Sequence, residues 1–157
     1  QRRSPEAVEA ARREVQELLA ADGEQNVRAL QRDIRNIMTE HCGVVRDEQG
    51  LRQGLAELDD VERRASDIGV HPDLAGYSEL SHAFDLKSSI LAARATLQRA
   101  LERRETRGCH NRSDYPQQDP ALRVNMIWSA DGTVTREQIP PVPEEIRALM
   151  GLSLIHI

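Results

Sequence analysis

The feature of this sequence that most constrains its fold is a helical period of apolar residues, which runs through most of the first 105 positions. Apolar residues that recur every three or four positions lie along one face of a helix, and that face must be buried against other helices. The first such stretch starts at Ser4 and Pro5, because a serine caps free backbone N–H groups and a proline suits the first helical turn. We expect this helix to end at the turn sequence ADG, residues 21–23. Its expected buried stripe consists of Val8, Ala11, Val15, Leu18 and Leu19.

Two more helices are predicted between residues 27 and 69. The first of these should end at Gly43, and its stripe consists of Val27, Leu30, Ile34, Ile37, Met38 and His41. Asp47 is a favourable cap for the next helix, which should end at Gly69. That helix has a stripe made of Leu51, Leu55, Leu58, Val61, Ala65 and Ile68. We expect a loop over residues 70–78, because the residue before Pro72 is biased toward an extended backbone.

A longer helix is predicted from about Tyr77 to Glu105, and at 1.5 Å per residue it would be roughly 40 Å long. Its expected buried stripe consists of Leu80, Phe84, Lys87, Leu91, Ala95, Leu97 and Leu101. Small residues on this helix would let its neighbours approach closely; they are Ala83, Ser88, Ala92 and Ala93. The predicted fold class is therefore mainly α, with a three- to four-helix antiparallel bundle over residues 1–105. An aromatic content of only 3% agrees with helices packed through aliphatic side chains.

The composition changes after residue 105, where Gly108, Pro116 and Pro120 interrupt any helix. Apolar and polar residues then alternate on both sides of the turn sequence ADGT, which predicts a small two-stranded β-hairpin. Trp128 in this hairpin is expected to anchor it on the bundle, and a short helix should begin near Pro143. We expect residues 106–150 to form an irregular C-terminal docking arm. The apolar end of the chain, residues 151–157, has no cap and is expected to be a non-native tail.

Charge, hydropathy and cysteine spacing exclude several functional classes. The net charge of -5 argues against a nucleic-acid partner, because nonspecific affinity comes from a positive surface that neutralises phosphates. No apolar run approaches the about 18 residues that cross a bilayer, so direct membrane insertion is not expected. Cys42 and Cys109 lie far apart without a CxxC motif, which favours a reducing compartment over a disulfide scaffold.

The most unusual stretch is RRETRGCHNRSDYPQQDP, residues 103–120, which we call the arginine-rich segment. Its four arginines surround Cys109 and His110, and arginine can grip carboxylates or phosphates with two parallel hydrogen bonds. A solvated run of charge is the usual explanation for such a stretch. The fixed placement of glycine, aspartate, tyrosine and proline residues here favours a segment with a defined shape.

Two chemical interpretations of this segment are less favoured than packing roles. A metal site would combine His41 and Cys42 with Cys109 and His110, but adjacent helical residues project about 100° apart and the spacing matches no common ligand pattern. A nucleophilic Cys109–His110 pair would need a third group to orient the histidine, and none is identifiable. His41 is more typical of a half-buried residue at a helix C-terminus. No glycine-rich phosphate loop is present, so this chain is not expected to bind a dinucleotide by itself, and we predict no metal site in it.

The arginine-rich segment, with Glu102 before it, resembles the signature near the end of the flavoprotein subunits of succinate dehydrogenases and fumarate reductases, which L-aspartate oxidase shares. The residues that fit are Arg103, Arg104, Glu105, Thr106, Arg107, Gly108, His110, Arg112, Asp114, Tyr115, Pro116 and Asp119. Residues 29–58 and 77–101 are similar to the helices that precede this signature. Cys109 departs from the usual small residue, and residues 122–146 differ from the tail of respiratory-complex subunits, so the substrate of the parent protein stays open.

The resemblance implies that the chain is a fragment: the C-terminal helical domain of a succinate dehydrogenase/fumarate reductase-type oxidoreductase. It would pack against the upstream FAD-binding domain and capping domain. The resemblance implies that those upstream parts contain the catalytic and cofactor-binding residues, that this chain contains none of them, and that it would be inactive alone. The expected docking residues are Arg104, Glu105, Arg107, Gly108, His110, Arg112, Asp114 and Tyr115, with the arginines at 104, 107 and 112 pairing with the partner surface. The resemblance further implies an iron-sulfur subunit in the full complex and a cytoplasmic location, with membrane association through other subunits.

Three alternatives to this docking role stay open at the level of sequence. The arginine-rich segment could reach the dicarboxylate site, which would give Arg107 or His110 a direct electrostatic role. The parent protein could be of the L-aspartate oxidase type. The chain could also be a free-standing helical interaction module.

Overall fold

The computed structural model describes residues 4–71 and 78–149 of the chain. Its helices are α1 (Pro5–Leu19), α2 (Val27–His41), α3 (Glu48–Arg64), α4 (Ser78–Glu102) and α5 (Glu144–Leu149), with 3₁₀ turns η1 (Ala65–Asp67) and η2 (Pro120–Leu122). Its strands are β1 (Gln25–Asn26), β2 (Val45–Arg46), β3 (Ile68–Gly69), β4 (Asn111–Arg112), β5 (Val124–Trp128) and β6 (Val134–Gln138). The expected tail and most of the expected loop over residues 70–78 lie outside the described residues.

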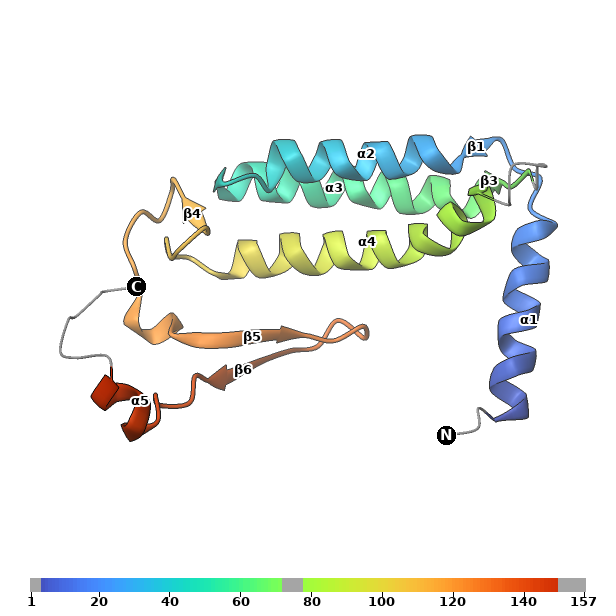
Figure 1. Ribbon diagram of the computed structural model, residues 1–157. Coiled ribbons are helices and arrows are strands. Elements are labelled where there is room, and N and C mark those ends of the chain that lie inside the picture. Colours follow the sequence, from blue (N-terminus) through green and yellow to red (C-terminus); the bar gives the residue numbers. More distant parts are fainter. Residues whose placement is uncertain (1–3, 72–77, 150–157) are drawn as a thin grey trace.

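Helices α2, α3 and α4 lie side by side and alternate in direction, so the bundle has three helices (Figure 1). Their facing stripes form one apolar core, in which Leu51, Leu58 and Leu97 have no exposed surface. The mainly α fold class is therefore confirmed. The stripes predicted for α2 and α3 also agree with the structure, because their members are buried or pack against the core.

Side chains cap the first turns of both α2 and α3. The Asp47 carboxylate accepts the Gly50 N–H at 2.8 Å, as the sequence predicted. The Asn26 side chain accepts the Ala29 N–H at 3.0 Å, a cap that the sequence analysis missed. The prediction that α3 continues to Gly69 was wrong, because the helix ends at Arg64 and the chain then forms a 3₁₀ turn and the strand β3.

Gly54 lies where α3 packs closely against α2 and α4. A Cβ atom on this residue would lie 2.9 Å from the His41 Cβ of α2 and 3.1 Å from the Leu97 Cδ2 of α4. Both distances are too short for ordinary van der Waals contact, so the packing at this level requires a residue without a side chain.

The predicted stripe of α4 was wrong by a rotation of the helix. Its buried residues are Ala83, Leu86, Ile90, Ala93, Leu97 and Ala100, which alternate steps of three and four as in a coiled-coil seam. Of the predicted stripe, Leu97 is buried and Leu80 and Leu101 pack against the core, whereas Phe84 is 37% exposed. Apolar residues surround this helix on all sides, so the period alone does not select one face. The side of α4 that carries the alanines is the buried one, because small side chains let α2 and α3 approach closely.

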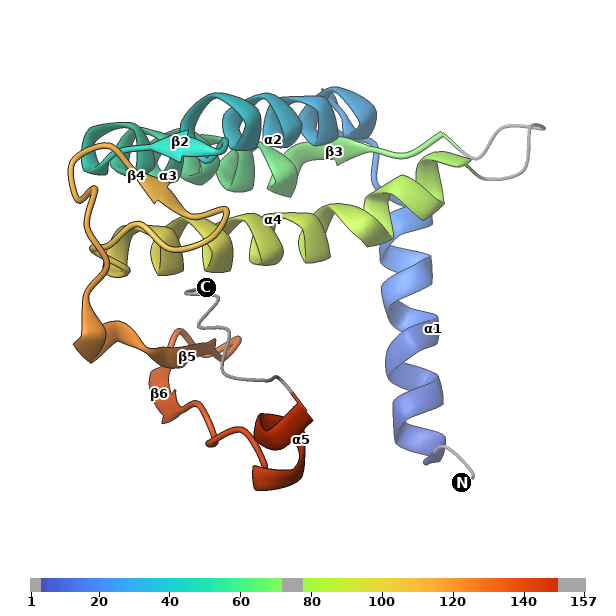
Figure 2. The same ribbon diagram turned by 60° about the vertical axis from the view of Figure 1, so that its left-hand side comes forward.

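Helix α1 does not join the bundle, although the predicted cap is present: the Ser4 hydroxyl accepts the Ala7 N–H at 3.2 Å. The helix projects away from the other helices (Figures 1 and 2) and has no buried residue, so its predicted stripe was wrong. Only Leu18 packs against the core. The turn after α1 is fixed by main-chain hydrogen bonds from Gly23 N to Ile68 O (3.1 Å) and from Val70 N to Ala21 O (2.9 Å), which direct the helix outward.

Short parallel strand pairs fasten the bundle at both ends. At the α1 end β1 pairs with β3, and at the opposite end β2 pairs with β4, in the register Val45 to Asn111 and Arg46 to Arg112 (Figures 1 and 2). Neither pair was predicted, because two-residue strands have no detectable alternation.

The C-terminal hairpin and the short helix after it confirm the sequence prediction. Strands β5 and β6 pair antiparallel, and α5 follows the proline-rich stretch. Trp128 anchors the hairpin on α4, because its ring N–H donates to the Gln98 side chain at 2.8 Å. Arg136 of β6 pairs with Glu102 at 2.8 Å. None of the described helices is long and apolar enough to cross a membrane.

Candidate functional site: the arginine-rich segment

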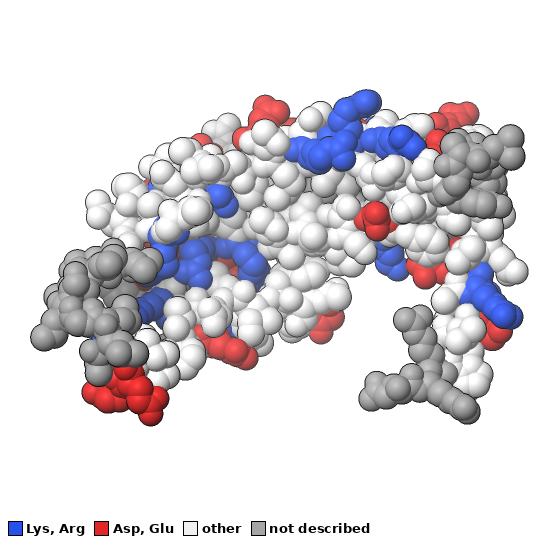
Figure 3. All heavy atoms as spheres, viewed as in Figure 1, with Lys and Arg blue, Asp and Glu red and all other residues white. Residues whose placement is uncertain are grey.

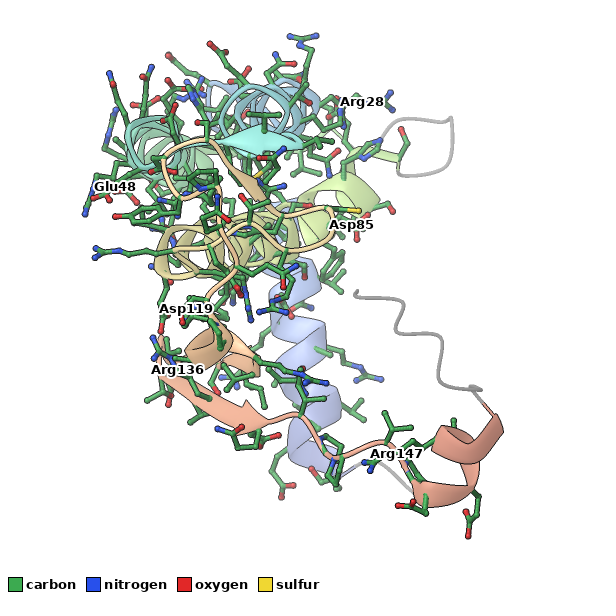
Figure 4. All side chains as sticks on the ribbon, turned by 90° about the vertical axis from the view of Figure 1, so that its left-hand side faces the viewer. Arg28, Glu48, Asp85, Asp119, Arg136 and Arg147 are labelled. Carbon is green, nitrogen blue, oxygen red and sulfur yellow. The ribbon has the colours of Figure 1, made fainter. Side chains whose placement is uncertain are left out.

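The arginine-rich segment leaves α4 and folds over the end of the bundle, the end that faces the viewer in Figure 4. Its first part is a tight turn in which Arg107 and His110 exchange main-chain hydrogen bonds of 2.8 and 3.0 Å. Gly108 within the turn has φ +56°, a left-handed conformation that strongly favours glycine. The prediction that α4 continues to Glu105 was wrong, because the helix ends at Glu102 and the segment takes over its last carbonyl groups.

The carboxylate of Glu105 is the centre of the first ion-paired cluster. It has no exposed surface and accepts hydrogen bonds from Arg103 Nη1 (2.5 Å), Arg107 Nε (3.0 Å) and Nη2 (2.9 Å), and Asp119 N (2.9 Å). Burial raises the pKa of this carboxyl, but the hydrogen bonds from Arg107, the Asp119 N–H and Arg103 outweigh burial and lower the pKa below its usual value. The same contacts raise the pKa of Arg107.

Arg112 is the centre of the second ion-paired cluster and is also fully buried. Its Nε and Nη2 donate to the two Asp114 oxygens, both at 2.7 Å. Its Nη1 caps the end of α4 by donating to the carbonyls of Ala100 (2.8 Å) and Leu101 (3.1 Å). The guanidinium also lies 4.9 Å from the centre of the Tyr115 ring. A single arginine thus closes the helix and holds the chain that follows.

Asp114 connects this cluster to the start of α3. One of its oxygens accepts the Glu48 N–H at 2.9 Å, where the first turn of α3 has a free donor. The hydrogen bonds from Arg112 lower the pKa of the Asp114 carboxyl to about 2, against the cost of its burial. The carboxylate therefore links the C-terminus of α4 to the N-terminus of α3.

Thr106 and His110 complete the fold of the segment. The Thr106 hydroxyl accepts the Arg112 N–H at 2.9 Å and donates to the Tyr115 carbonyl at 3.0 Å. The His110 ring N–H at Nε2 donates to the Arg103 carbonyl at 2.9 Å. Burial, followed by the charges of nearby arginines, lowers the pKa of His110 despite this hydrogen bond. The imidazole is therefore neutral at neutral pH.

The structure changes how the predicted docking residues are understood. Arg107 and Arg112 were expected to pair with a partner surface, but their guanidinium groups pair with Glu105 and Asp114 of the same chain. Arg104 is exposed, and its guanidinium lies 5.9 Å from the Tyr115 ring. A docking role for the segment stays a prediction, but the ion pairs give it a defined shape, as the sequence analysis expected.

The four residues considered for a metal site have different surroundings. His41 is more buried than expected and lies 3.2 Å from Glu57 of α3, while His110 bonds to the Arg103 carbonyl. Cys42 is half-buried beside Arg46, and burial raises the pKa of its thiol, although Arg46 opposes this shift. Cys109 is exposed. Within residues 4–71 and 78–149, no group of three or more His, Cys, Asp or Glu side chains is close enough to hold a metal ion.

A cationic cleft lies beside the arginine-rich segment, and sequence analysis did not identify it. It has a volume of about 400 Å³ and is lined by Arg46, Arg99, Arg103 and His110, together with the small side of α4. Figure 3 shows lysine and arginine side chains gathered in a hollow between the helices and the C-terminal arm. The signal was hidden because Arg46 and Arg99 come from distant parts of the sequence.

A three-helix bundle whose arginines serve mainly to close its own end defines a helical structural domain. The family model described as "Fumarate reductase flavoprotein C-term" matches residues 31–146. The chain therefore belongs to the C-terminal domain family of the succinate dehydrogenase and fumarate reductase flavoproteins.

Relatives with known names cover most of this chain. An uncharacterized FAD-dependent oxidoreductase of Methanocaldococcus jannaschii is 32% identical over 113 residues, which is 72% of this chain and 20% of that protein. The fumarate reductase flavoprotein subunit of Helicobacter pylori is 34% identical over 138 residues, 87% of this chain and 19% of that protein. L-Aspartate oxidase of Pyrococcus furiosus is 37% identical over 99 residues, 63% of this chain and 17% of that protein. The chain thus spans about a fifth of the length of these relatives.

Solved structures contain the same fold. A chain of the Mycobacterium smegmatis Sdh1 complex in the apo form matches with a TM-score of 0.78 and 25% identity. The match covers 96% of this chain and 27% of that one. The bundle, the arginine-rich segment and the hairpin together therefore follow the architecture of a known structure.

Proposed function

We propose that this chain is the C-terminal helical domain of an FAD-dependent oxidoreductase of the succinate dehydrogenase/fumarate reductase type. We call it a buttress, meaning a domain that supports the flavin-binding part by packing against it. The preceding part of the polypeptide would bind FAD and the substrate, and this domain would pack against it. The observation that supports the proposal most directly is the family match over residues 31–146, which includes the whole arginine-rich segment.

The geometry of the segment favours a buttress over a direct catalytic role. The Arg107 guanidinium donates hydrogen bonds to the Glu105 carboxylate and to the Asp119 carbonyl. The Nε2–H group of His110 donates a hydrogen bond to the Arg103 carbonyl. Groups already paired inside the domain would have to break strong charge-assisted hydrogen bonds before they could bind a substrate. The segment instead gives the domain a rigid end that can hold a neighbouring domain in place.

The names of the relatives support a substrate class. The fumarate reductase and succinate dehydrogenase flavoprotein subunits favour a four-carbon dicarboxylate as the substrate of the full-length protein. In this proposal an iron-sulfur subunit takes the electrons, and other subunits provide any membrane association. The 37% identity with L-aspartate oxidase supports a second candidate, oxidation of an amino dicarboxylate. The domain itself does not discriminate between these two activities, because its residues would lie outside the substrate site in both.

The test uses the full-length polypeptide. We expect it to bind FAD, seen by its visible absorption, and to catalyse either succinate oxidation and fumarate reduction or L-aspartate oxidation. Residues 1–157 alone should bind no flavin and oxidise no dicarboxylate. Tight flavin binding or dicarboxylate oxidation by residues 1–157 alone would contradict the proposal.

Arg107→Ala in the full-length protein separates the buttress from a direct role. The variant leaves the buried Glu105 carboxylate with fewer donors, so we expect a lower thermal midpoint and lower flavin retention. Turnover per bound flavin should change little. A loss of turnover with full stability and full flavin content would instead support contact with the substrate.

A further inference from the structure

The cationic cleft contains arginine groups that this chain does not satisfy. Arg46 makes only long contacts, to the Cys42 sulfur at 3.7 Å and to the Cys109 carbonyl at 3.4 Å. In the described parts of the chain no carboxylate lies within ion-pair distance of Arg46. The Nε atoms of Arg46 and Arg99 are buried and have no hydrogen-bond acceptor. Buried donors without an acceptor are costly and rare in folded proteins, so these atoms call for an acceptor from outside the chain.

The other arginines of the cleft are paired with carboxylates of the same chain. Arg99 is ion-paired with Glu102, and Arg103 is committed to Glu105 and to the carbonyls of Leu122 and Val124. These pairs hold the two guanidinium groups at the wall of the cleft and leave Arg46 as its uncompensated charge. His110 lies on the same wall and has a lowered pKa, in part because of Arg46 and Arg103. A carboxylate fits this cleft, because it can accept hydrogen bonds from the arginine donors and compensate the charge of Arg46.

Two exposed apolar residues immediately precede Arg46 in the sequence. Val44 is 69% exposed and Val45 is 61% exposed. Strand β2, which carries Val45 and Arg46, is held against β4 by its parallel pairing, so the backbone that carries the valines and the arginine is fixed at this end of the bundle. Adjacent exposed valines close in sequence to donors that lack an acceptor fit a surface that another polypeptide segment covers.

The length of the relatives indicates what covers this surface. The chain matches only about a fifth of their length, and the family model describes the matched part as the C-terminal part. Most of the relatives' polypeptide therefore lies outside the matched region. A segment that precedes the domain in the same polypeptide is present at high effective concentration, which favours it over a separate molecule.

We infer that the cleft of Arg46 and Arg99, together with the surface formed by Val44 and Val45, binds an acidic segment of the upstream flavin-binding part of the same polypeptide. An aspartate or glutamate of that segment accepts hydrogen bonds from both arginines, and an adjacent apolar residue covers the valines. The inference rests on the proposed function and names the surface through which the buttress acts.

Zero-length cross-linking of the full-length protein tests this contact. Arg46→Lys keeps the charge and introduces an amine that a carbodiimide joins to a carboxylate in direct contact. The background within this domain is low, because Lys87 is its only lysine. Arg32→Lys, at an exposed position of α2, is the matched control. We expect a roughly tenfold excess of one cross-linked peptide in Arg46→Lys over the control, joining position 46 to an acidic residue upstream of the domain.

A charge reversal provides a second measurement. Arg46→Glu should lower the thermal midpoint of the full-length protein by several degrees, whereas Arg32→Glu should leave it unchanged. Cross-links from position 46 only to residues within the domain, or to a separate subunit, would overturn the inference, as would equal midpoints for the two reversals. Flavin content is measured in parallel. Normal flavin content without the cross-link would reject this surface alone, whereas absence of flavin from the full-length wild type would reject the proposed function.

Discussion

The bundle core and the arginine-rich segment are both buried, but opposite kinds of interaction hold them together. The core consists of aliphatic side chains from three helices, with Leu51, Leu58 and Leu97 fully enclosed. The segment encloses two full charges, Glu105 and Arg112, at 0% exposure. Apolar packing is non-directional and tolerates replacement by residues of similar volume. A buried charge is tolerated only while each of its partners stays in place. The two regions should therefore respond differently to conservative substitutions.

Removing the Glu105 carboxylate is expected to change the free energy of unfolding the most. Glu105→Ala strands the guanidinium groups of Arg103 and Arg107, and we expect the free energy of unfolding to fall by about 3–5 kcal/mol. Urea unfolding followed by helical circular dichroism measures this change. Glu9→Ala is the matched control, because Glu9 and Arg12 form an exposed pair that should contribute less than about 1 kcal/mol. Equal effects of the two substitutions would show that burial of the Glu105 pairs contributes nothing.

A substitution in the core should cost somewhat less and should tolerate a conservative replacement. Leu97→Ala leaves a cavity among the three helices, and we expect a loss of about 3 kcal/mol. Leu97→Met conserves volume and should cost less than about 1.5 kcal/mol. Glu105→Asp conserves charge but shortens the side chain by one methylene, which withdraws it from its donors. If Glu105→Asp cost less than Leu97→Met in the same assay, the contrast between the two regions would be wrong.

The smallest of the three effects is a pH dependence confined to the segment. The pKa of Asp114 falls from 3.8 to about 2 on folding, so its contribution is fully present above pH 4 and is lost as the pH falls toward 2. We expect a loss of about 1–2 kcal/mol across this window, after allowance for partial exposure of the carboxylate. The unfolding free energy of Asp114→Asn, compared with wild type between pH 2 and 6, isolates this carboxyl from the others. An unchanged pH slope in the variant would show that Asp114 does not contribute.

The same contrast explains how much of the fold could be predicted from sequence. The caps at Ser4 and Asp47, the faces of α2 and α3 and the hairpin followed from local periods and turn residues. The face of α4 did not, because apolar residues surround it and close approach at Gly54 selects the alanine side. Helix α1 shows the reverse case, since its apolar period has no partner within the bundle.

The candidate site was found from sequence through the family signature, but its contacts were not. The arginines were recognised as groups that grip carboxylates, and they do so. Their partners are nevertheless Glu105 and Asp114, only two residues away from Arg107 and Arg112. The choice between an internal and an external carboxylate depends on how the backbone turns at Gly108, and the identity of the residues does not by itself give that conformation. The cleft of Arg46 and Arg99 was missed for a related reason, because it exists only once α2, α3 and α4 are assembled.

The parallel pairing of β2 with β4 has a consequence for the order of events during biosynthesis. Its two strands are Val45–Arg46 and Asn111–Arg112, so the pairing cannot form until the ribosome has released the chain well beyond α4. The three helices can associate earlier, through contacts closer in sequence. The charged end should therefore fold after the three-helix bundle, and a nascent chain stalled before Asn111 would expose the unfinished end to proteases and chaperones.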